Sequence, residues 1–91
     1  MQNSKFMEEP KYIKPDLKPG INACFIHPNP WMCMWGVLKT SFWNGYTRDE
    51  LIRFLEEYKK NLIKEKKDAE AKYIEEALGF FEGKFGEELK L

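Results

Sequence analysis

The chain has 91 residues, 43% of them apolar, and its 15 Lys plus Arg balance 15 Asp plus Glu. This length allows one small domain with a modest core, because a short chain leaves a large share of its surface in water. A net charge of zero provides no field toward nucleic acid or an anionic membrane, so binding to polyanions through charge alone is disfavoured.

The two cysteines, Cys24 and Cys33, are predicted to be reduced thiols in the cytoplasm. Met1 is followed by neither the basic segment nor the apolar segment of a secretory signal. The longest nearly apolar run, 31–38, has eight residues, whereas a helix needs about 20 to cross a bilayer. We therefore expect a cytoplasmic protein that does not span a membrane.

Residues 1–20 are predicted to form an extended N-terminal arm. They contain Pro10, Pro15 and Pro19 and show neither helical nor strand periodicity. Proline lacks the backbone N–H that helices and sheets use, so its repetition disfavours both structures. The arm would lead into a single small helical domain over 21–91.

Residues 21–26 form a short apolar run at the start of this predicted domain. Gly20 and Pro28 bound the run, and several of its residues favour β-structure. We therefore predict one short strand here.

Residues 30–43 are rich in tryptophan and allow two structures. Asn29 can cap a helix that has Pro30 in its first position. One face of that helix would carry five large apolar side chains: Trp31, Met34, Trp35, Leu38 and Phe42. Gly36 in the interior of this helix would destabilise it by up to about 1 kcal/mol relative to alanine. The alternative is a β-hairpin that turns at 27–30 and packs on the following helix, which would give an α+β fold.

A long amphipathic helix is predicted over about 48–78. The sequence before it has the spacing of a capping box, in which the Thr47 hydroxyl accepts from the Glu50 backbone and the Glu50 carboxylate reaches back. Neither glycine nor proline interrupts the segment. Its apolar stripe consists of Leu51, Leu55, Tyr58, Leu62, Ala69, Tyr73 and Ala77. A break near 64–68 would give a helical hairpin instead, but no turn residue supports it.

Gly79 is predicted to end this helix, and the tail that follows is predicted to fold back. The tail contains Phe80, Phe81 and Phe85, which would be unfavourable to leave in water. A helix of 31 residues is about 46 Å long, and the rest of the chain is too short to cover it. The predicted fold is therefore a mainly α small single domain whose long helix needs a partner or a second copy.

Cys24, His27 and Cys33 are three possible zinc ligands within ten residues. A closed structural site needs four ligands, and the chain contains no other Cys or His. A catalytic Cys-His pair would draw all its groups from this one segment, whereas active sites usually combine separate elements. We therefore predict no metal site, no cofactor and no enzymatic activity.

Seven residues are the candidate binding surface: Trp31, Trp35, Lys39, Phe42, Trp43, Tyr46 and Arg48. Aromatic side chains supply large contact areas at protein interfaces. The sequence favours a small non-enzymatic protein-binding module, an inhibitor, adaptor or small subunit of a larger assembly. Its partner would be another protein or a second copy, contacted through the long helix and the aromatic cluster.

The alternative function is an oligomer that sequesters a nucleotide-like small molecule between its subunits. In that case the aromatic rings would stack a base, and Lys39 and Arg48 would hold a phosphate. Nucleic acid itself is disfavoured as a partner, because acidic residues interrupt the lysines of 59–72.

Overall fold

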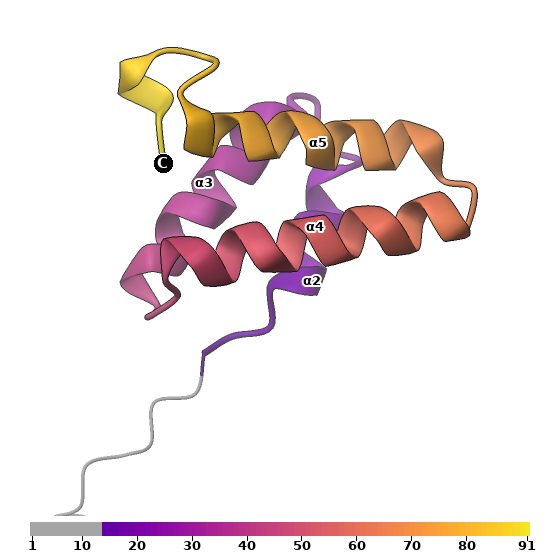
Figure 1. Ribbon diagram of the computed structural model, residues 1–91, viewed down its shortest axis with the longest axis horizontal. Helices are drawn as coiled ribbons and strands as arrows, with labels where there is room; N and C mark the ends of the chain where they lie inside the picture. Colours follow the sequence, from indigo (N-terminus) through magenta and orange to yellow (C-terminus); the bar gives the residue numbers. More distant parts are fainter. Residues whose placement is uncertain (1–13) are drawn as a thin grey trace, which may run out of the picture.

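The structure, a computed structural model, describes residues 14–91, and this part of the chain contains four α-helices and one short 3-10 helix (Figure 1). The elements are α2 (Leu17–Cys24), α3 (Pro30–Trp43), α4 (Arg48–Lys64), α5 (Asp68–Glu82) and η1 (Glu87–Leu89). Residues 14–91 include no strand, so the β-hairpin of the α+β alternative is not found. The prediction of a mainly α small single domain is confirmed.

The helices form two pairs. α4 and α5 lie side by side and antiparallel, with α2 and α3 behind them (Figure 1). All four helices contribute to one core: Leu17, Ile21, Cys24, Met34, Leu38, Leu51, Leu55, Tyr58, Leu62, Ala71, Ile74, Ala77, Phe80 and Phe81. None of the helices in the described part of the chain is both long enough and apolar enough to cross a membrane.

Helix α2 includes residues 21–24 of the predicted strand 21–26, and residues 25 and 26 form the turn that follows it. The Asp16 side chain caps α2 by accepting a hydrogen bond from the Lys18 backbone N–H at 3.0 Å. Pro19 lies in the first turn, where backbone N–H groups have no partner within the helix, so its missing N–H removes no helical hydrogen bond. The strand prediction is wrong because Pro19 is part of α2 and does not mark the start of a strand.

The predicted extended arm, 1–20, falls only partly within the structure. Residues 1–13 lie outside the described residues, whereas 17–20 are helical, so the arm prediction is wrong for 17–20. The buried residues of α2 follow a spacing of four and three, which is the helical period: Leu17, Ile21 and Cys24. This spacing places them on the face of α2 that joins the core.

Helix α3 confirms the helical interpretation of the tryptophan-rich segment. The Asn29 side chain accepts from the Met32 backbone N–H at 3.3 Å, and Pro30 is the first helical residue. Met34 and Leu38 are fully buried. The three rings predicted on the same face, Trp31, Trp35 and Phe42, are only partly buried. Because Trp31 and Phe42 lie at opposite ends of α3, the helix exposes aromatic surface at both ends.

The predicted capping box at the start of α4 is confirmed. Thr47 Oγ1 accepts from the Glu50 backbone N–H at 3.1 Å, and the Glu50 carboxylate accepts from the Thr47 backbone N–H at 2.8 Å. Lys14 Nζ donates to both Glu50 carboxylate oxygens at 2.8 Å. The hydrogen bond from Lys14, followed by that from the Thr47 backbone, lowers the pKa of Glu50.

Replacing Thr47 with alanine is expected to lower the free energy of unfolding by about 1 kcal/mol, because one backbone N–H of the first turn loses its acceptor. Urea denaturation of the parent and of Thr47→Ala measures this difference. Thr40→Ala is the matched control, since Thr40 is exposed within α3 and caps no helix. Equal free energies for the parent and Thr47→Ala would show that the capping box does not stabilise α4.

The prediction of one continuous helix over 48–78 is wrong. The chain forms two helices, α4 and α5, joined by residues 65–67. This is the helical hairpin that a break near 64–68 would produce. Tertiary packing explains it, because the hairpin buries the apolar faces of both halves within one chain, whereas a single long helix would leave part of its stripe in water.

Backbone hydrogen bonds make the turn between α4 and α5. Lys67 N–H donates to the Leu62 carbonyl at 2.8 Å, and Lys66 N–H donates to the Ile63 carbonyl at 3.0 Å. This pattern ends many helices and requires a left-handed residue, here Lys66, whose φ is 61°. α5 ends in the same way, but at Gly83, whose φ is 76°. The left-handed conformation strains a residue with a side chain by about 1–2 kcal/mol.

Replacing Lys66 with glycine is expected to raise the free energy of unfolding by about 0.5 kcal/mol, since relief of the strain exceeds the entropy that glycine loses on folding. Lys64→Gly is the control. Lys64 is the last residue of α4, where glycine is expected to lower the free energy of unfolding by up to about 1 kcal/mol. Urea denaturation compares the two variants, and a loss of stability in Lys66→Gly would argue for a helix that continues through the turn.

The apolar stripe changes phase at this turn. The predicted stripe residues of α4 are all buried: Leu51, Leu55, Tyr58 and Leu62. In α5 the prediction holds only in part, because Ala77 is buried, Tyr73 is half-buried and Ala69 is exposed. The non-helical residues 65–67 shift the helical register, and α5 buries Ala71, Ile74, Ala77, Phe80 and Phe81. Tyr73 and Ala77 therefore give no reason to expect a second copy.

Gly79 does not end the helix, contrary to the prediction, because α5 continues to Glu82. Gly79 is buried, and a Cβ at this position would lie 3.0 Å from Cε2 of Phe85. The glycine thus lets the Phe85 ring lie against α5. The tail folds back as predicted, with Leu91 N–H donating to the Phe80 carbonyl at 2.9 Å.

Candidate functional site

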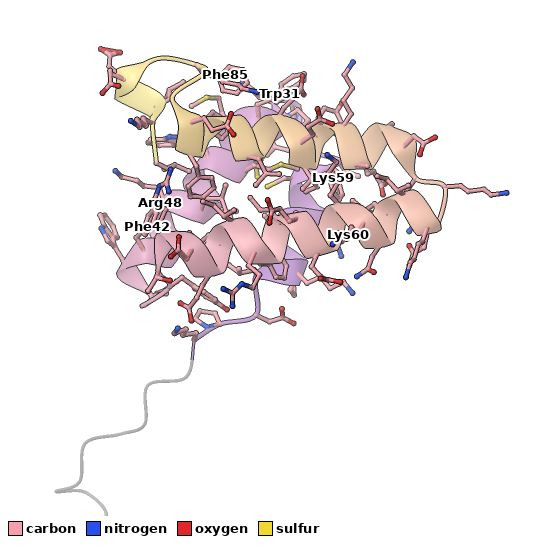
Figure 2. The ribbon with its side chains drawn as sticks, in the orientation of Figure 1. Trp31, Phe42, Arg48, Lys59, Lys60 and Phe85 are labelled. Atoms are coloured by element: carbon pink, nitrogen blue, oxygen red, sulfur yellow. The ribbon has the colours of Figure 1, made fainter. Side chains whose placement is uncertain are left out.

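The seven residues of the predicted binding surface do not line one pocket. Trp31 and Phe42 come from opposite ends of α3. Trp31 lies beside Phe85 along the upper edge of the molecule in Figure 2, whereas Phe42 and Arg48 lie at the left, where α4 begins. The surface therefore divides into separate parts.

Trp31 is held in place but remains 40% exposed. Its indole N–H donates to Glu76 Oε1 at 2.5 Å, and its ring meets the Tyr73 ring edge-on with 5.3 Å between centroids. These contacts join the first turn of α3 to α5. One side of a large indole is thus fixed while the rest contacts solvent.

Trp35 and Lys39 contact their own chain. The Trp35 indole N–H donates to the Leu89 carbonyl at 2.8 Å, which ties η1 to α3. Trp35 is half-buried against the core, and Lys39 Nζ lies 5.9 Å from the centroid of its ring. The structure thus gives Trp35 a role in holding the C-terminal tail.

Phe42, Trp43 and Tyr46 lie at the other end of α3. Phe42 and Tyr46 are half-buried against the core, and the Tyr46 hydroxyl donates to the Pro15 carbonyl at 2.7 Å. Trp43 is 82% exposed. An indole with so little support from its own chain is a weaker anchor than Trp31.

Arg48 links the start of α4 to the end of α5. Its Nη2 donates to the Phe81 carbonyl at 2.7 Å, and its guanidinium carbon lies 5.7 Å from the centroid of the Phe81 ring. Arg48 and Lys39, the cations of the nucleotide alternative, thus each lie against a different aromatic ring of their own chain. They do not converge on one pocket.

A groove of about 370 Å³ lies between the start of α3, α5 and the tail. We call it the Trp31 groove, and it is lined by Asn29, Trp31, Met32, Glu76, Phe80, Phe85 and Leu89. Met32 is 42% exposed and Phe85 is 46% exposed, so with Trp31 they surround the groove with accessible apolar surface. Its size lies within the range that accommodates ligands or partner side chains.

Only Trp31 of this groove belongs to the predicted binding surface. Phe85 lies between Gly83 and Gly86 and has charged neighbours, a pattern that could have marked it as a ring presented by a turn. Met32 carries no such signal, because its exposure depends on how α3 packs against α5. Glu76 is the one charged residue among those that line the groove.

The possible zinc ligands are only partly assembled. Cys24 and Cys33 meet, with Cys24 Sγ donating to Cys33 Sγ at 2.7 Å. His27 is exposed, and its Nδ1 accepts from the Asn29 backbone N–H at 3.0 Å. Within residues 14–91, no three His, Cys, Asp or Glu side chains are grouped so that they could hold a metal ion.

Comparisons with protein-family models, with curated proteins and with solved structures find no match to this chain. Any functional inference therefore depends on the site itself. Accessible apolar surface around the Trp31 groove is its main chemical property.

Proposed function

We propose that this protein is a small non-enzymatic protein-binding module, an inhibitor, adaptor or subunit, that binds an apolar side chain of its partner in the Trp31 groove. The exposure of Trp31, Met32 and Phe85 around one groove is the observation that supports the proposal. Apolar side chains in water are unfavourable, and their concentration around a concave site is typical of protein interfaces.

Contacts among the side chains at the groove support binding. Glu76 and Tyr73 hold the Trp31 ring, and the Phe80 ring lies 5.1 Å from that of Phe85, measured between centroids. Side chains that are already ordered lose little conformational entropy when a partner binds. An indole held in this way can act as an anchor for an apolar partner side chain.

Glu76 suggests the chemistry of the partner. One of its carboxylate oxygens accepts from Trp31, and the other can accept from a cation or an N–H group. The groove is otherwise lined by neutral side chains. A segment with an apolar residue next to Lys or Arg therefore fits it best.

Affinity capture from an extract of the native cells, followed by mass spectrometry, tests this proposal. Met32→Asp places a charge in the groove and is expected to lower recovery of the partner at least tenfold. Trp43→Ala is the control, because it removes an exposed indole outside the groove. Loss of the partner with Trp43→Ala alone, or the absence of any partner sensitive to Met32→Asp, would overturn the proposal.

A second copy of the chain is the other partner to consider. The monomer mass is 10.9 kDa, so light scattering of the pure protein separates monomer from dimer. If two copies meet through the Trp31 groove, Met32→Asp converts the dimer to a monomer. If the parent protein is monomeric, the proposed partner in the Trp31 groove is a different protein.

A further inference from the structure

Two thiols from different helices meet beneath an open groove. Cys24 is the last residue of α2 and is fully buried, whereas Cys33, in α3, is half-buried. Cys33 also lines a groove of about 460 Å³ between α2 and α3, together with Gly20, Gly36 and Val37. Small molecules can therefore approach Cys33, while Cys24 lies behind it.

We propose that Cys24 and Cys33 are a reversible oxidation site, at which a low-molecular-weight disulfide such as glutathione disulfide converts the pair to an intramolecular disulfide. The contact of 2.7 Å between the two Sγ atoms and the access to Cys33 support this assignment. The bond would join the end of α2 to the start of α3. The proposal does not depend on the function of the Trp31 groove.

The reaction proceeds in two exchange steps. Cys33, as a thiolate, attacks one sulfur of glutathione disulfide, which forms a mixed disulfide on Cys33 and releases one glutathione thiolate. Cys24 then loses its proton and attacks Cys33 Sγ, which releases the second glutathione. Overall the protein loses two electrons and two protons, and glutathione disulfide is reduced to two molecules of glutathione.

The environment of each thiol determines which one attacks first and which one resolves the mixed disulfide. Burial, and then the hydrogen bond to Cys33, raise the pKa of the Cys24 thiol to about 12, so Cys24 is a poor first nucleophile. Cys33 contacts solvent and accepts the proton of Cys24 in their hydrogen bond. Cys24 is therefore the resolving thiol, effective because it already touches the sulfur that it attacks.

Oxidation fits the geometry better than metal binding. Two thiolates on one tetrahedral zinc ion lie about 3.8 Å apart, given Zn–S bonds of about 2.3 Å. At 2.7 Å the two sulfurs leave no space for an ion between them. His27 lies against the backbone of Asn29 and does not complete a ligand set.

Incubation of the full chain in glutathione buffers of increasing oxidised fraction, followed by mass spectrometry, tests the proposal. We expect a product about 2 Da lighter than the parent that dithiothreitol reverses. Closing the ten-residue loop restricts the unfolded chain, so the melting temperature is expected to rise by on the order of 10 °C.

Two variants identify the thiols. Cys24→Ser is expected to stop at one glutathione adduct on Cys33, and Cys33→Ser is expected to leave Cys24 unmodified under native conditions. Circular dichroism of both variants checks that each one is folded. The proposal is overturned if the parent keeps a glutathione adduct without resolving it, forms covalent dimers, or resists oxidation, or if Cys33→Ser reacts as fast as Cys24→Ser.

Discussion

Replacement of Phe81 by alanine is expected to lower the free energy of unfolding by about 3–5 kcal/mol, a large loss for a small domain. Phe81 is 2% exposed and lies in the last turn of α5. Its ring faces core residues and also lies under the Arg48 guanidinium. Truncation therefore removes buried apolar area, leaves a cavity and takes away the cation–π contact.

Urea denaturation followed by circular dichroism measures the effect of Phe81→Ala. Phe85→Ala is the matched control, because it deletes the same side chain four residues later, where the ring is 46% exposed. We expect a loss of about 1 kcal/mol or less for the control. Phe81→Leu, a milder change, keeps the comparison measurable if the alanine variant does not fold. Equal losses at the two positions would show that the Phe81 ring is not buried.

High pH is expected to destabilise the protein through Cys24. Burial, followed by the hydrogen bond and the charge of Cys33, raises the pKa of Cys24 from 9.0 to about 12. The thiol stays protonated in the folded protein at a pH where it ionises in the unfolded chain. Its contribution to stability is therefore complete below pH 9 and is lost as the pH rises toward 12.

Urea denaturation at several pH values under reducing conditions measures this loss. Cys24→Ser is the control, because serine keeps a hydroxyl donor of similar size but does not titrate in this range. Tyr58 contributes in the same range, since burial, and then Glu70 and Glu65, raise its pKa above 10.0. The contribution of Cys24 is therefore the difference between the parent and Cys24→Ser. No difference would mean that the thiol ionises equally well in both states.

Local signals made the starts of α3 and α4 predictable. The capping box at Thr47 and the Asn29-Pro30 pair lie within a few residues of the backbone groups that they satisfy, so the sequence alone identifies them. Asp16 caps α2 in the same manner. The sequence nevertheless does not predict α2, because Pro19 and Gly20 usually mark the end of a helix or strand. Proline is, however, tolerated within the first turn of a helix.

The turn at 65–67 and the Trp31 groove could not be predicted in this way. Lys66 does not favour the left-handed conformation, and packing of α4 against α5 imposes it. The groove combines Met32 with Phe85, which are 53 positions apart in the sequence. Their proximity depends on where the tail crosses α5, and hydrophobic periodicity within one helix carries no information about that.

The short connection at 65–67 also affects the rate and order of folding. It lets α4 and α5 pair after closing a loop of only a few residues, which restricts little chain entropy, so this hairpin is expected to form before α2 docks. Stopped-flow measurements are then expected to show that Leu62→Ala mainly slows folding and that Leu17→Ala mainly speeds unfolding. The reverse pattern would place the folding nucleus in α2 and α3.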